Sequence, residues 1–201
     1  MPTAEQLAKS IQLDGQGVHV LLWDHQDDLV RALIVLFAAL HDTPLQPLLL
    51  ASAQASVSDL RKIFELRPQE TNSVTSEEDS LVPSRQSLLV LFLQQATSSS
   101  IGPWLNGWRS ALAEKPGALL VVRHADFLDF QRNAPDLASF FASKAFDTSS
   151  MLSIWSASTA KRMKTLLPRE VVGILGKLPG KMPSGKDIES WVREHPPLTD
   201  Q

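Results

Sequence analysis

Four aspartates are the side chains of this sequence best suited to bind a metal ion. Asp24, Asp27 and Asp28 come directly after the first long apolar segment, and Asp126 follows the fourth. Mg²⁺ prefers carboxylate oxygens in proteins and keeps several waters, so these residues are candidate magnesium ligands. Carboxylates at the start of a helix also stabilise its positive end while they stay solvated, and we favour this second interpretation.

The residue types give little support to other catalytic chemistry. The chain has no cysteine, which excludes disulfides, thiolate metal sites and cysteine nucleophiles. Its five histidines are scattered and form no His-x-x-x-His or Glu-x-x-His pair, so no zinc site is predicted. No Gly-x-Ser-x-Gly elbow is present, and we expect Ser156 and Ser158, placed at a strand end, to satisfy backbone groups. We therefore predict no catalytic residue and no cofactor.

Two charged segments are candidate interaction surfaces, one basic and one acidic. The basic segment could contact a phosphate or an acidic partner, whereas the simpler interpretation is a solvated helix face. The net charge of −3 provides no general field that would hold nucleic acid or an anionic membrane, so we expect a protein partner. A homo-oligomer is left open. The candidate interaction residues are Lys161, Arg162, Lys164 and Arg169 in the basic segment and Glu77 and Glu78 in the acidic one.

Short apolar runs alternate with helical patterns along the chain. Near-continuous apolar runs indicate strands buried on both faces, as in a mainly parallel sheet covered by helices. We therefore predict an α/β fold, a three-layer sandwich around about five strands. The predicted strands are 18–23, 47–52, 87–93, 118–122 and 151–156, and the predicted helices are 27–40 (a central, buried helix), 57–66, 101–113, 133–146 and 187–194.

The length of 201 residues suits one domain with a small appendage. We predict an α/β domain over residues 1–177 and a short helical extension over 178–201, which begins in a segment rich in Gly, Pro and Lys. Residues 67–85 are polar and read as an exposed loop. The first residues carry no pattern typical of a secretion signal, and no apolar stretch is long enough to span a bilayer, so we expect a cytoplasmic location.

The order of these elements resembles the core of P-loop ATPases, especially the AAA type. Residues 118–127 look like the family's Walker B strand, an apolar run followed by an acid. Residues 132–137 then lead into a helix, and residues 152–159 stand in the place of the sensor strand. The resemblance covers roughly residues 17–170 and implies a P-loop-like fold.

The sequence departs from that family where ATP would bind. The family has a Gly-rich turn and Gly-Lys-Ser or Gly-Lys-Thr after the first strand, and its backbone N–H groups cradle the phosphates. Here the turn at 23–28 has no glycine and no lysine, and its three carboxylates would repel a triphosphate unless a metal intervened. Arg123 and His124 also stand where the family usually carries acids, and only Asp126 remains.

These departures predict a non-catalytic interaction or scaffold module, a degenerate ATPase-like fold that acts in a larger assembly. Its partner would be another protein, such as a larger ATPase or a complex subunit. The alternative is a magnesium-dependent enzyme or sensor of a phosphate-containing ligand, which would use the four aspartates. The conformation of the turn at 23–28 separates the two, because inward N–H groups would favour nucleotide binding and a turn filled by its own side chains would not.

Overall fold

Five parallel strands form one sheet in the computed structural model, which describes residues 3–14, 17–41, 46–51, 87–93, 101–113, 117–141, 145–152, 157–166 and 185–194. The order across the sheet is β2-β3-β4-β1-β5, and every neighbouring pair is parallel. The predicted α/β class with a parallel sheet is confirmed. The strands are β1 (Val18–Trp23), β2 (Gln46–Ala51), β3 (Ser87–Leu93), β4 (Ala118–Arg123) and β5 (Ala145–Asp147).

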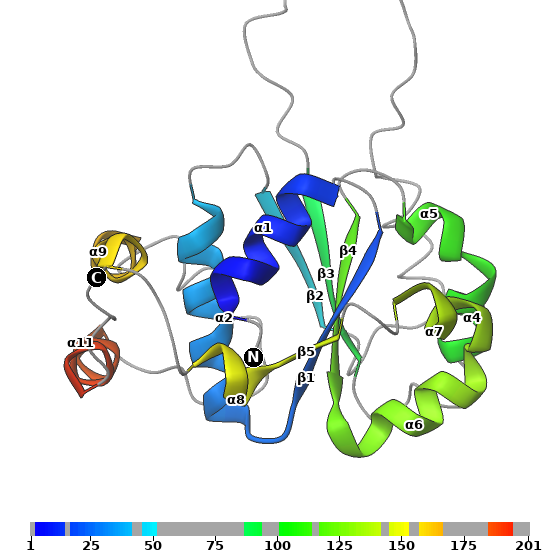
Figure 1. Ribbon diagram of the computed structural model, residues 1–201. Helices are drawn as coiled ribbons and strands as arrows, with labels where there is room; N and C mark the ends of the chain where they lie inside the picture. Colours follow the sequence, from blue (N-terminus) through cyan, green and yellow to red (C-terminus); the bar gives the residue numbers. More distant parts are fainter. Residues whose placement is uncertain are drawn as a thin grey trace, which may run out of the picture.

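Helices cover both faces of the sheet, so the molecule has three layers (Figure 1). The helices on one face are α1 (Ala4–Asp14), α2 (Gln26–Leu40), α8 (Thr148–Met151), α9 (Ala157–Leu166) and α11 (Gly185–Glu194). The helices on the other face are α4 (Ile101–Gly107), α5 (Arg109–Ala113), α6 (His124–Asn133) and α7 (Pro135–Phe141).

The strands supply side chains to two separate cores because successive residues of a strand point to opposite faces. In β1, Leu21 packs with α1 and α2, whereas Val20 and Leu22 pack on the opposite face with Phe130 of α6 and Leu137 of α7. Burial on both faces explains why the strand sequences are apolar without alternation.

Helix α2 is the central helix of its layer. Ten of its fifteen residues are buried, and it packs against α1, α9 and strand β1. A helix that is apolar on nearly every face needs cover on every face, which this position provides. The prediction of a buried central helix over 27–40 is confirmed, and so are the first four strands and the helix near the C-terminal end.

The prediction of a strand at 151–156 is wrong at its start, because Met151 ends helix α8; residues 153–156 lie outside the described residues. The fifth described strand is β5, whose first two residues, Ala145 and Phe146, were predicted as the end of the helix 133–146. The reason is local: the Oδ1 atom of Asp147 accepts the backbone N–H of Ser149 at 2.8 Å, which caps the first turn of α8 and ends the strand.

Smaller differences concern the helices. The predicted helix 101–113 is two helices that meet at Trp108, because Gly107 is a poor helix former and ends α4. Helices α1 and α6 lie in segments for which no helix is predicted. The predicted helix 57–66 and the predicted loop 67–85 lie outside the described residues.

Candidate functional site

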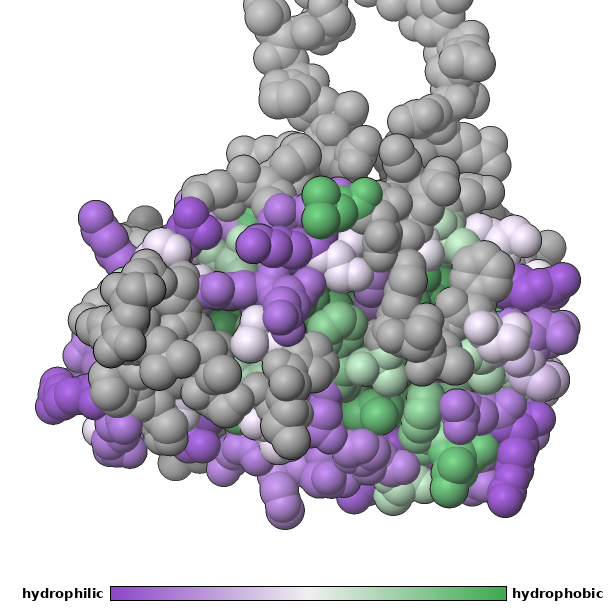
Figure 2. All heavy atoms as spheres, viewed as in Figure 1, coloured by the Kyte–Doolittle hydropathy of each residue, from purple (hydrophilic) through white to green (hydrophobic). Residues whose placement is uncertain are grey.

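The carboxyl ends of β1, β4 and β5 meet at one edge of the sheet and form the candidate site. From this edge β1 continues into α2 on one face, whereas β4 continues into α6 on the opposite face. Such a reversal between neighbouring strands is a topological switch point, where ligands of open α/β sheets usually bind. At the bottom of the view in Figure 2, hydrophilic residues lie at the centre and left, and hydrophobic residues lie among them on the right.

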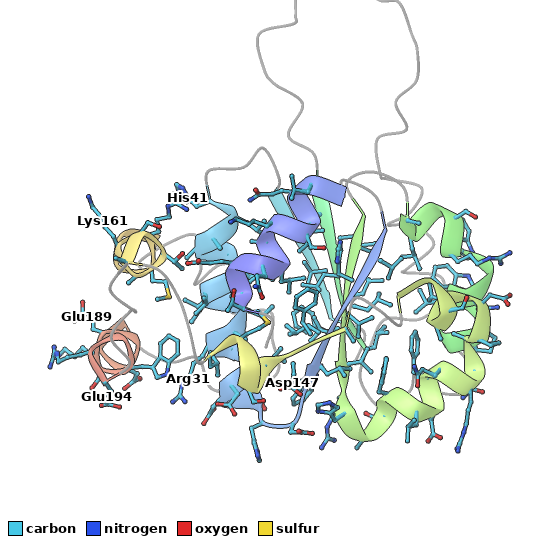
Figure 3. All side chains as sticks on the ribbon, viewed as in Figure 1. Arg31, His41, Asp147, Lys161, Glu189 and Glu194 are labelled. Carbon is cyan, nitrogen blue, oxygen red and sulfur yellow. The ribbon has the colours of Figure 1, made fainter. Side chains whose placement is uncertain are left out.

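His124 bridges two carboxylates at the switch point. Its Nδ1 atom lies 3.1 Å from Oδ2 of Asp24, which follows β1, and its Nε2 atom lies 3.3 Å from Oδ2 of Asp147, the last residue of β5. Figure 3 shows Asp147 at the same edge of the sheet as the turn between β1 and α2. One imidazole ring therefore connects the ends of three strands, and we call these three residues the His124 bridge.

The hydrogen-bond roles in the His124 bridge follow from the groups that meet there. An ionised carboxylate only accepts hydrogen bonds, so the imidazole is the donor, and its tautomer decides which ring nitrogen donates. Asp147 is held from its other side, because its Oδ1 atom accepts from the backbone N–H and the hydroxyl of Ser149.

Arg123 and Trp23 occupy the neighbouring position, where β1 and β4 pair residue for residue. The guanidinium carbon of Arg123 lies 5.5 Å from the centre of the Trp23 ring, which is cation–π geometry. The Nε atom of Arg123 and the Oδ2 atom of Asp126 are buried without a hydrogen-bond partner. Asp126 lies in the first turn of α6, past the end of β4 where the Walker B comparison would put an acid.

The turn between β1 and α2 is only two residues long, since β1 ends at Trp23 and α2 begins at Gln26. One of these residues, Asp24, is directed at His124, and the other, His25, is the N-cap of α2. A phosphate-binding loop needs several successive residues whose N–H groups surround the phosphate. The connection here is shorter than such a loop, and its two side chains, Asp24 and His25, are exposed.

Two other predicted metal ligands, Asp27 and Asp28, are not part of the His124 bridge. Asp27 and Asp28 belong to the first turn of α2, where they favour the helix dipole, and Asp28 lies 3.7 Å from Arg31. Within the described ranges, no group of three or more His, Asp or Glu side chains is arranged to hold a metal ion. The two carboxylates of the His124 bridge contact different nitrogens of one ring.

Most of the predicted interaction residues have side chains outside the part of the chain that the structure describes. Lys161 is exposed and Arg162 is half-buried, and both belong to α9. Lys164 also belongs to α9, but its side chain lies outside the description, as do Arg169, Glu77 and Glu78 altogether. Ser158 lies in the first turn of α9, not at the end of a strand, and Ser156 lies outside the described residues.

Sequence reasoning missed Asp147, the third member of the His124 bridge. Its segment reads Asp147-Thr148-Ser149, an acid followed by two hydroxyl residues, which is a pattern typical of a helix N-cap. That signal marks the start of α8. It does not reveal that β5 lies beside β1, which is what brings the carboxylate to His124.

Comparison with known proteins gives no relative: neither a scan against protein-family models nor a search of curated proteins finds a match. In the part of the chain that the structure describes, no helix combines the length and the apolar character needed to cross a membrane.

Proposed function

We propose that this protein is a non-catalytic scaffold module, an ATPase-like α/β domain that binds another protein in a larger assembly. The observation that carries the proposal is the two-residue turn between β1 and α2. It supports a scaffold role because the position where a phosphate loop would begin is occupied by Asp24, which contacts His124.

The charges at the switch point support the same proposal. Asp24, Asp27 and Asp28 stand at the N-terminus of α2, which would otherwise attract an anion through its free N–H groups and its dipole. Three carboxylates here oppose the approach of a triphosphate.

The AAA-type resemblance rests on the linear order of strands and helices, and on β4 as an apolar run followed by Asp126. An AAA-type ancestry with lost phosphate chemistry is part of the proposal.

The first test is the partner. The full chain, tagged and expressed in its native host, is captured with chemical cross-linking and its partners are identified by mass spectrometry. We expect one protein in near-equal amount, retained after washing with ATP and with a chelator. A chain that is recovered alone under every condition contradicts the scaffold proposal.

The second test addresses nucleotide binding by thermal shift. We expect the melting temperature to move by less than about 1 °C with ATP, ADP or GTP, each with and without Mg²⁺, because ligand binding stabilises only where affinity exists. A rise of several degrees that needs Mg²⁺ and one nucleotide, and that Asp126→Ala abolishes, would instead support the magnesium-dependent alternative. Asp129→Ala, which changes an exposed acid of the same helix, is the matched control.

A further inference from the structure

We draw no further inference here: the strongest candidate, the exposed apolar face of α6 around Leu128, whose side chain is 64% exposed, carries none because nothing in the structure shows what covers it.

Discussion

His124 joins strand ends that are distant in sequence, and solvent limits how much the junction can stabilise the fold. The side chains of His124, Asp24 and Asp147 are 40%, 61% and 32% exposed. Ion pairs at such exposure contribute little, because water screens the attraction and ordering the side chains costs entropy. We therefore regard the His124 bridge as a device that fixes the shape of the switch point more than as a source of stability.

Replacement of His124 tests that view. We expect His124→Ala to lower the free energy of unfolding by about 1 kcal/mol or less in low salt, and by less in high salt. Urea unfolding monitored by circular dichroism measures the difference. Asp129→Ala is the control, because its carboxylate pairs with Arg132 on an open surface. A loss of several kcal/mol would mean that the His124 bridge supports the core.

At the scale of elements, the start of the sheet depends on two glycines that face each other. Gly17 precedes β1 and Gly117 precedes β4, and both have positive φ, at 115° and 85°. The carbonyl oxygen of Gly17 accepts the N–H of Ala118 at 3.2 Å, and a Cβ atom built on Gly117 would lie 2.5 Å from that oxygen. The close approach and the backbone angle both require glycine at this point.

We therefore predict that Gly117→Ala destabilises the protein by roughly 2 kcal/mol or more, from the strained backbone and the displaced carbonyl together. The matched control is Gly107→Ala, since a Cβ there has nothing within 4 Å. It should leave stability unchanged or raise it by up to about 1 kcal/mol, because alanine favours the helix. Differential scanning calorimetry compares the two variants. Equal melting temperatures of the two variants would contradict the prediction, because they would mean that β1 and β4 can move apart at their first residues without loss of stability.

Elements with enough residues to carry a pattern were predictable. Helix α2 and the first four strands have apolar runs that few other structures could bury. Helix α1 could also have been predicted from the sequence, because Ala4, Leu7, Ala8 and Ile11 are spaced to form one buried helical face. Strand β5 was not, since its three residues are a strand only through their pairing with β1.

The sequence predicts the negative charge of the candidate site but not the contacts between its side chains. The acidic residues of the turn at 23–28 are visible in the sequence, and the structure places Asp24 in the two-residue connection between β1 and α2. The contact between Asp24 and His124 joins positions 100 apart. It depends on the order of strands in the sheet, a tertiary property that no local pattern encodes.

At the scale of the whole molecule, stability should fall from the centre of the sheet to the outer helix. β1 and β4 are paired on both sides and buried between two helical layers, whereas Trp191 is the one buried residue among the described side chains of α11. Regions with few buried contacts open locally at lower free energy than the core. We predict that the amides of α11 exchange with deuterium at least a hundredfold faster than those of β1, as measured by hydrogen exchange with mass spectrometry. Trp191→Ala should accelerate exchange in α11 and leave β1 unchanged. If α11 and β1 exchange at one common rate, the helix leaves the body only when the whole protein unfolds, which contradicts the predicted gradient of stability.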